Sequence, residues 1–414
     1  MILLIPFIVL FFFLRRNSLS RLFILIQIIS LVAGIITGKK FEIDNLTDVF
    51  WVGITFAITC LIVLPYRNYI PPHNIDVINP NKISVLTKFL VLINSFIFVV
   101  FSIAAFIVQT SVTDINEFKY SEGESVDFYY SALPFPSFFF NIAILLHYFC
   151  YFLLPLHFYY LSRNRTKLAL ICLVLSFNVV LFGLTYFSRA ILLQYTLVYL
   201  ILFFFLRHTI GGSSRKLMKR VLFGFVGVIG LYFISISQSR FENNSYYSDK
   251  VPDESLVKNE QLYSYFDYLG QGLYNNHEVL KLYDGNTFSG QLTFQSLLSY
   301  LNQFGLIDYN AKAYKDLRET LWPFPYFYTF NSYTSYVIFD FGLVFGIVFS
   351  IIYLMIVKKV NPISNTIGIE KLMLVSLLIQ VPIMAIFYNQ IGTILLAFLI
   401  YFPINYYLKY KFKE

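Results

Sequence analysis

Long apolar segments separated by short polar connections run through most of this chain. Most of these runs are about 18–25 residues long, enough for a helix to cross the hydrocarbon core of a bilayer, which is roughly 30 Å thick. Because that core offers no water to backbone groups, each run is expected to be a helix. The pattern predicts an all-α polytopic membrane protein with about eleven spans, at roughly 2–14, 22–38, 49–65, 84–109, 137–161, 168–187, 190–206, 221–238, 335–357, 372–388 and 391–408.

One polar segment, rich in Tyr, Asn, Asp and Lys, interrupts this pattern from about Ser239 to Thr334. We therefore predict three parts: residues 1–238 with spans one to eight, residues 239–334 as a large loop, and residues 335–414 with the last three spans and a tail. Within the loop an amphipathic helix is expected where apolar residues recur with helical spacing, at Leu292, Phe294, Leu297, Leu298 and Leu301.

Composition supports the membrane class, since 57% of the 414 residues are hydrophobic and 13% are charged. A soluble domain of this size would carry about a quarter charged residues. The distribution of Lys and Arg predicts an orientation, because short cytoplasmic loops carry an excess of both residue types. One alternating set of connections holds nineteen of them and the other set holds four, namely Lys39, Lys40, Lys119 and Arg189. This predicts an outer N-terminus, a cytoplasmic C-terminus and an outer, periplasmic position for the large loop.

The sequence contains no motif or charge pattern typical of several other functional classes. The cytoplasmic excess of Lys and Arg accounts for the net charge of +8, so no nucleic-acid partner is predicted. Neither GxxxxGK[ST] nor GxGxxG nor HExxH occurs, and the longest cytoplasmic connection, about 66–83, is expected to be an irregular linker. Cys60, Cys150 and Cys172 lie within predicted spans and are expected to act as small apolar side chains. No metal or cofactor is expected.

Three arginines of the outer face are candidate phosphate contacts, because the planar guanidinium matches phosphate oxygens. Arg189 lies at the tight turn between spans six and seven, Arg240 just follows span eight, and Arg318 lies late in the large loop. The alternatives are structural. Arg189 would be an interfacial anchor, Arg240 a charge flanking a span and Arg318 a solvated loop charge.

Candidate acids and bases are few on the predicted outer face. Asp340 lies inside span nine, where a carboxylate is a functional-site hypothesis by default. His277 and Glu278 are adjacent in the large loop. All three are candidate general bases, and the alternatives are a structural role for Asp340 and ordinary loop positions for the other two.

Aromatic and amide side chains of the loop are candidate sugar contacts. Tyr265 belongs to an aromatic stretch, and Asn331 and Tyr333 lie where the chain re-enters the membrane. Aromatic rings provide stacking faces for sugars, but they also gather at membrane interfaces. An interfacial belt is the alternative for the aromatic side chains.

The chain resembles the Wzy-type oligosaccharide repeat-unit polymerases of bacterial O-antigen and capsule synthesis. The matching features are Ser188-Arg189 before an apolar helix, the large outer loop after the next helix, and Asn331, Thr334, Asp340-Phe341-Gly342 and Gly346 at the re-entry. The topology of the whole chain resembles the family, whereas individual residues match over about 183–346. The resemblance implies an architecture shared with O-antigen ligases and similar to GT-C membrane glycosyltransferases.

The resemblance implies a reaction in the bacterial inner membrane. A growing glycan on undecaprenyl diphosphate would be transferred at the periplasmic face to the next lipid-linked repeat unit, with a chain-length regulator as a candidate partner. Such a transfer needs fixed cations for the leaving diphosphate, here Arg189, Arg240 and Arg318. It can also use a base for the acceptor hydroxyl, for which Asp340, His277 and Glu278 are the candidates.

Two alternative functions stay open from the sequence. An O-antigen ligase would use the same donor and transfer the glycan to lipid A–core, and it shares the large outer loop. A repeat-unit flippase is a transporter, and it would more often show evenly short loops and a charged cavity within the membrane. Such embedded charges are scarce in this chain.

Overall fold

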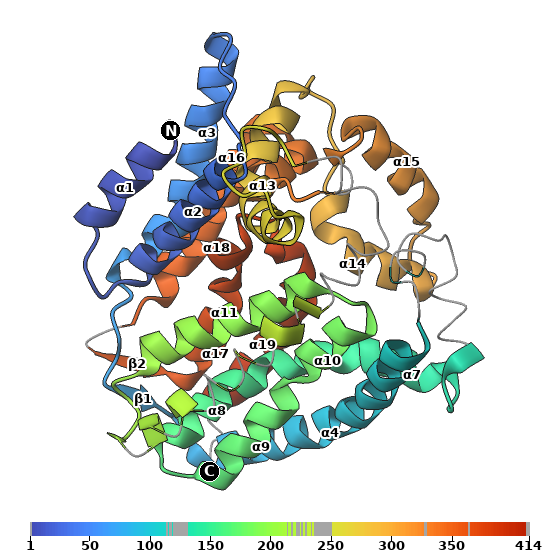
Figure 1. Cartoon of the computed structure of the whole chain (residues 1–414). Helices are drawn as coiled ribbons and strands as arrows, with labels where there is room; N and C mark the ends of the chain where they lie inside the picture. The colour runs from blue at the N-terminus through green and yellow to red at the C-terminus, as the bar shows by residue number, and fades with distance from the viewer. Residues whose placement is uncertain are drawn as a thin grey trace. The chain divides into compact units, whose positions relative to one another are not determined.

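The computed structural model describes residues 2–112, 131–212, 251–326, 329–362 and 365–410, together with scattered positions between 115 and 118 and between 214 and 235. Most of these residues are helical, and the sheet found among them has two short strands (Figure 1). Eight helical segments among the described residues are long and apolar enough to cross a membrane, and two of them, Ser137–Ser162 and Thr166–Thr185, each consist of consecutive shorter helices. These observations confirm the predicted class, an all-α polytopic membrane protein.

Three of the eleven predicted spans are not among those eight segments. The span at 2–14 is a helix of ten residues, α1 (Leu4–Phe13). The span at 372–388 is divided into α17 (Ile369–Leu378) and α18 (Gln380–Met384). Pro382 explains this division, because it lacks an N–H and its ring would clash with the carbonyl of Leu378 in a continuous helix. Most of the span at 221–238 lies outside the described residues.

One compact unit, here called unit 1, consists of Met1–Ile70, Ser245–Asn361 and Leu378–Leu396. It joins the beginning of the chain to the segment predicted as the large loop and to the helix that follows it. Its elements are α1, α2 (Leu19–Ile36), α3 (Leu46–Val63), η1 (Leu64–Asn68), α13 (Glu260–Lys281), α14 (Gln291–Gln303), α15 (Ala311–Leu321), α16 (Ser332–Val360), α18 and the first residues of α19 (Gln390–Lys409).

Unit 1 confirms the expected helix over residues 292–301, which lies within α14. The predicted boundary at Ser239 lies outside the described residues, and α16 begins at Ser332, two residues before the boundary predicted at Thr334. The division into three parts stays a prediction.

Glycines bring α2 and α13 into close contact inside unit 1. A Cβ added to Gly270 would lie 2.3 Å from the backbone nitrogen of Gly34, and one added to Gly34 would lie 2.1 Å from the ring of Tyr274. Across the same contact, the hydroxyl of Ser30 donates to the carbonyl of Leu269 at 2.8 Å. Small residues allow such close backbone approach between apolar helices, so α13 is held against a predicted membrane span.

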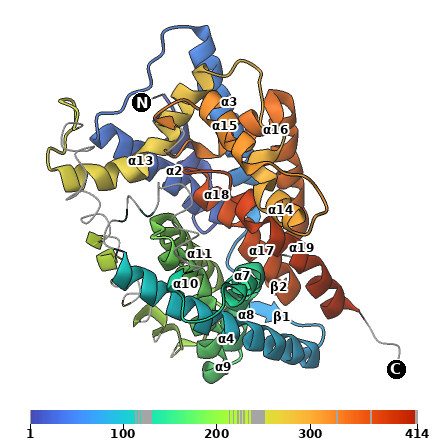
Figure 2. The same ribbon diagram turned by 90° about the vertical axis from the view of Figure 1, so that its right-hand side faces the viewer.

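Helix α16 is broken at Gly342, where φ is 81° and ψ is 166°. This conformation is open mainly to glycine, which has no Cβ. The break frees backbone carbonyls at the end of the first half of the helix. Two backbone N–H groups donate to these carbonyls: that of Phe288 to Phe339 at 2.7 Å, and that of Gly290 to Asp340 at 3.0 Å. The segment before α14 is thereby fixed to the break in α16. Figure 2 shows α14 and α16 as neighbouring helices.

The second compact unit, unit 2, consists of Pro71–Asn244, Pro362–Leu377 and Ala397–Glu414. A buried polar contact joins the short helix that begins at Asn178 to the long helix that contains Asn94, since the Asn178 side chain donates to the side-chain oxygen of Asn94 at 3.0 Å. The described elements of unit 2 are β1 (Asn74–Asp76), α4 (Pro80–Ser111), α7 (Ser137–Leu146), η2 (His147–Phe152), α8 (Leu153–Ser162), α9 (Thr166–Ser176), α10 (Asn178–Thr185), α11 (Arg189–Leu206), β2 (Thr366–Gly368), most of α17 and the rest of α19.

Unit 2 contains the sheet. Strands β1 and β2 are parallel, with Asn74 opposite Thr366 and Asp76 opposite Gly368. The connection at 66–83, expected to be irregular, therefore contains a strand. Three residues are too few for an alternating pattern to be recognised in the sequence, and their partner strand lies about 290 residues away along the chain.

Candidate functional site

One face of α15 presents a cation between aromatic rings. Tyr314, Arg318 and Trp322 follow one another at intervals of four residues, so they lie on one side of the helix. The Arg318 guanidinium carbon lies 5.6 Å from the centre of the Trp322 ring, within the range of a cation–π contact. Trp322 is fully buried and its ring packs edge-on against Tyr336 of α16, with 4.9 Å between the ring centres.

A cavity of about 160 Å³ opens beside this face of α15, entirely within unit 1. Four helical segments contribute to it: α14, α15, the first half of α16, and the turn that starts α19. Arg318 is the one charged side chain among the described residues that line it. The lining residues are Leu292, Gln295, Ser296, Tyr314, Arg318, Tyr336, Tyr388, Asn389, Gly392 and Thr393.

The Asp340 carboxylate positions α14 over this cavity. Its two oxygens accept from the backbone N–H groups of Leu292 and Thr293, at 3.0 and 2.8 Å. These N–H groups belong to the first turn of α14 and have no partner within the helix. A carboxylate at a helix N-terminus also interacts favourably with the helix dipole. Asp340 thus caps α14 and ties it to α16.

The beginning of α19 completes the cavity. Asn389 donates from its side-chain nitrogen to the Thr293 hydroxyl at 2.9 Å, and its side-chain oxygen accepts from the N–H of Ile391 at 3.0 Å. Gly392 allows α14 to approach, because a Cβ there would lie 2.8 Å from the carbonyl oxygen of Thr293. The positive end of the α19 dipole therefore lies at the cavity wall.

The electrostatics of the cavity favour an anion. Burial raises the pKa of the Tyr314 phenol, although the nearby Arg318 guanidinium acts in the opposite direction. The Tyr314 phenol therefore stays protonated at neutral pH and can donate a hydrogen bond. The Tyr314 side chain is 5% exposed, and its hydroxyl has no hydrogen-bond partner among the described residues.

A permanent cation, phenolic donors and a helix N-terminus form a recurrent arrangement for phosphate or carboxylate groups. The cavity also contains the neutral polar side chains of Gln295, Ser296 and Asn389. A small anionic group is consequently the ligand class that these residues fit best. No acidic residue lines the cavity among the described positions, so repulsion from a fixed carboxylate at its wall does not oppose such a ligand.

The other candidate bases lie on α13. The His277 side chain is 2% exposed, its Nε2 lies 2.8 Å from the backbone carbonyl oxygen of Glu42, and its Nδ1 is buried. The Glu278 carboxylate is 3.3 Å from the ammonium of Lys281. Neither residue lines the Arg318 cavity. A general-base role for Asp340, His277 or Glu278 stays a prediction, and in this structure Asp340 has a structural role.

The candidate sugar contacts are positioned by internal hydrogen bonds. Asn331 donates to the carbonyl of Tyr326 at 2.8 Å just before α16 begins. Tyr333 is 1% exposed, and its hydroxyl lies 3.4 Å from that of Ser350. Tyr265 is partly buried on α13. Contacts of these residues with a glycan stay predictions.

The predicted arginine cluster is divided between different parts of the chain. Arg318 belongs to unit 1, and Arg189, the first residue of α11, belongs to unit 2. Arg240 lies outside the described residues. Joint binding of a diphosphate by these side chains stays a prediction. Within the described part of the chain, His, Cys, Asp and Glu side chains form no group that could hold a metal ion.

The sequence interpretation found Arg318 and Asp340 but missed Tyr314, Tyr336, Tyr388 and Asn389. A signal for Tyr314 was present, since its spacing from Arg318 and Trp322 predicts one helical face. Nothing in the sequence connects Tyr388 or Asn389 with α15, because more than 60 residues separate them.

Comparisons of the chain with protein-family models, with curated proteins and with solved structures give no match. The function is therefore argued from the site and from the chemistry of its residues.

Proposed function

We propose that the chain is a membrane glycosyltransferase that polymerises lipid-linked oligosaccharide repeat units. In this proposal the growing glycan leaves undecaprenyl diphosphate and is transferred to the next repeat unit at the periplasmic face of the bacterial inner membrane. The sequence resemblance to Wzy-type polymerases suggests this reaction. The eight long apolar helical segments support a membrane setting for it.

The observation that carries the proposal is the cavity at Arg318. Two helices of the segment predicted as the outer loop, α14 and α15, line it together with the first half of α16 and the start of α19. Departure of a glycan from a lipid diphosphate leaves negative charge on the phosphate oxygens. Fixed donors that already surround the position of that charge stabilise the transition state. Arg318, Tyr314 and the α19 N-terminus are donors of this kind.

The remaining predictions belong to the same proposal. Eleven spans with an outer N-terminus and a cytoplasmic C-terminus would put the Arg318 cavity on the periplasmic side, because the large loop then lies outside. Arg189 and Arg240 are proposed as further phosphate contacts. Tyr265, Asn331 and Tyr333 are proposed for the glycan, and His277 or Glu278 is proposed as the base, since the Asp340 carboxylate already caps α14.

An Arg318→Ala variant should lose about 10- to 100-fold in polymerisation rate, because a hydrogen bond to a charged group contributes about 1.5–3 kcal/mol. The measurement is polymer formed per unit time by membranes supplied with lipid-linked repeat units, normalised to the amount of folded protein. Arg318→Lys should recover part of the rate, since it restores charge without the planar fork. Lys312→Ala is the matched control, because Lys312 is exposed on the same helix. Equal rates for the Arg318→Ala and Lys312→Ala variants would reject the cavity as the phosphate site.

Deletion of the gene in its host separates polymerisation from the alternative functions. Loss of a polymerase should leave single repeat units attached to their final acceptor, because export and ligation of one unit continue. The measurement is the size distribution of surface glycans on a gel, with the restored gene as control. Absence of even the single unit would instead indicate a ligase or a flippase.

A further inference from the structure

Basic side chains gather at one end of unit 1, where three segments that are distant in the sequence meet. The segments are the turn between α1 and α2 with the start of α2, the short helix η1, and the last turn of α16. Together they supply what is here called the basic patch: Arg15, Arg16, Arg21, Arg67, Lys358 and Lys359. The patch is therefore assembled by the fold from separate parts of the chain.

Hydrogen bonds hold these three segments together. The backbone N–H of Leu19, the first residue of α2, donates to the carbonyl of Tyr69, directly after η1, at 3.2 Å. The Tyr69 hydroxyl in turn donates to the carbonyl of Val357 at 2.6 Å, in the last turn of α16. Every member of the basic patch lies within four residues of Leu19, Tyr69 or Val357, so the six charges share one region of unit 1.

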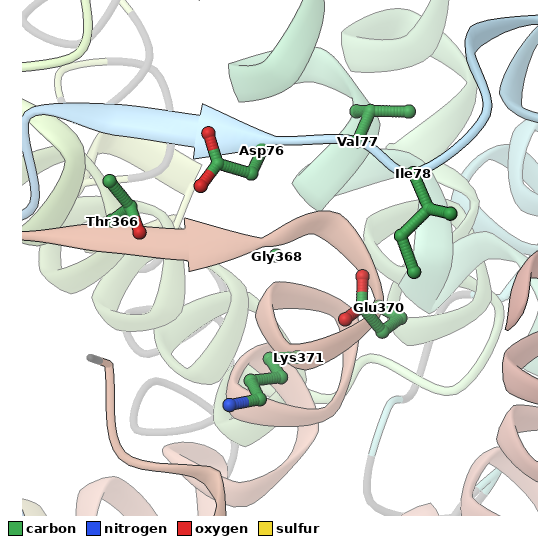
Figure 3. A pocket seen from close by; sticks show the side chains of 7 residues that line it. All are labelled: Asp76, Val77, Ile78, Thr366, Gly368, Glu370 and Lys371. Atoms are coloured by element: carbon green, nitrogen blue, oxygen red, sulfur yellow. The ribbon is translucent and has the colours of Figure 1, made fainter. Parts of the chain in front are cut away.

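The segments that form the basic patch contain no acidic residue. Neither Asp nor Glu occurs in residues 1–41, 49–75 or 341–369, which supply all six cations. The acidic residues that follow two of these ranges, Asp76 and Glu370, belong to unit 2 and line a cavity there (Figure 3). The basic patch is thus positive without compensation from its own segments.

The cations of the basic patch are accessible. No ion pair joins any of them to another residue in the described part of the chain. The Arg21 guanidinium carbon lies 4.2 Å from the centre of the Phe11 ring, which holds this side chain against the end of α1. The other five side chains are exposed, namely Arg15, Arg16, Arg67, Lys358 and Lys359. Six like charges held together repel one another, so an anion bound among them would relieve this repulsion.

An exposed apolar face of α1 leads to the basic patch. Ile5 and Phe12 are exposed, and their spacing of seven residues places them on the same side of the helix. Another side of α1 is packed, because Phe7 is fully buried and its ring centre lies 5.2 Å from that of Phe56 in α3. The exposed face ends three residues before Arg15, so apolar surface and positive charge are adjacent.

We propose that the basic patch binds the headgroup phosphates of anionic phospholipids, with an acyl chain along the exposed face of α1. Guanidinium groups match phosphate oxygens, and basic residues beside membrane helices attract anionic headgroups. The adjacent apolar face favours a lipid over a soluble phosphate compound. Tyr336 of the Arg318 cavity lies near the start of α16 and Lys358 near its end, so this site is separate from the proposed glycosyl transfer.

Native mass spectrometry of the purified full-length protein, titrated in detergent with dioleoyl-phosphatidylglycerol, tests the proposal. We expect Arg15→Gln/Arg67→Gln to weaken binding about 10- to 30-fold, because each cation near an anionic lipid surface contributes roughly fivefold in affinity. Lys40→Gln/Lys312→Gln is the matched control, since it also removes two exposed cations of unit 1, both outside the basic patch, and it should bind like the wild type. Equal affinity of the Arg15→Gln/Arg67→Gln variant and the wild type would overturn the proposal.

Two further ligands separate the lipid from other sources of the same chemistry. Dioleoyl-phosphatidylethanolamine has the same acyl chains and no net charge, and it should bind at least tenfold more weakly than phosphatidylglycerol. Glycerol 1-phosphate carries the anionic phosphate without acyl chains, and it should not displace the lipid at equal concentration. Equal binding of the two lipids, or displacement by glycerol phosphate, would contradict an anionic phospholipid as the occupant.

A charge-conserving variant separates lost contact from lost folding. Arg15→Lys/Arg67→Lys keeps both charges, so it should bind phosphatidylglycerol at least fivefold more tightly than Arg15→Gln/Arg67→Gln. Added phosphatidylglycerol should also raise the melting temperature of the wild type and of the lysine variant more than that of the glutamine variant. Equal loss of affinity in the lysine and glutamine variants would mean that charge does not hold the lipid, which rejects the proposal.

Discussion

A Gly272→Ala variant should fail to assemble unit 1. Gly272 lies in the middle of α13, and a Cβ there would lie 1.7 Å from the backbone carbonyl oxygen of Ile386, just before α19. The obstacle is backbone, so no rotation of a side chain can relieve it. Overpacking typically costs about 1–3 kcal/mol, and a clash with backbone belongs at or above the upper end. We therefore expect a loss of at least about 3 kcal/mol.

The measurement is the yield of monodisperse protein in detergent, together with the apparent melting temperature of any folded fraction. Gly53→Ala is the matched control, because Gly53 lies inside α3 and an added Cβ would meet no atom within 4 Å. That control should be neutral or more stable by about 0.5–1 kcal/mol, since alanine favours the helix. Equal behaviour of the two variants would mean that α13 does not pack against the Ile386 turn in this way.

The second large effect is expected for Asp340→Ala. The substitution removes the acceptor of the Leu292 and Thr293 N–H groups, and Thr293 is 1% exposed. Loss of a helix cap costs about 0.5–2 kcal/mol, and each buried donor left without an acceptor costs about 1–3 kcal/mol. A total loss of about 2 kcal/mol or more should lower the melting temperature and the abundance of the protein in membranes.

Two variants separate this structural role from catalysis. Asp340→Asn keeps one side-chain acceptor, so it should recover part of the stability, whereas Asp316→Ala, on the exposed side of α15, should match the wild type. Polymer synthesis should follow the amount of folded protein in all three variants. An Asp340→Ala protein of normal stability that makes no polymer would contradict the capping role and favour a general base.

The sequence predicted the long helices well, because a continuous apolar run has few alternatives in a membrane. Its errors occur where one residue changes the backbone locally. Pro382 divides a predicted span, and Gly342 breaks α16 although the apolar pattern continues through it. The strand at 74–76 is too short to produce a pattern and forms because β2 is present beside it.

The candidate site was predicted in part. Arg318 was recognised by its charge in a segment with few basic residues, and Asp340 by its position inside a span. The partners of both residues depend on contacts between distant segments. Asp340 bonds to N–H groups 47 and 48 residues earlier in the chain, and no sequence pattern encodes that pairing. The helical face that joins Tyr314 to Arg318 could have been found, whereas Tyr388 and Asn389 could not.

The sequence by itself determined the membrane class, most of the spans and the types of residue available for chemistry, because hydrophobicity and local helical hydrogen bonding depend on neighbouring residues. The tertiary structure alone decided which of those residues share a site. It assigned Asp340 to the N-terminal end of α14 and surrounded Arg318 with phenols and a helix N-terminus. Both outcomes depend on segments brought together by packing, and Gly392 allows the close approach of α14 to the start of α19.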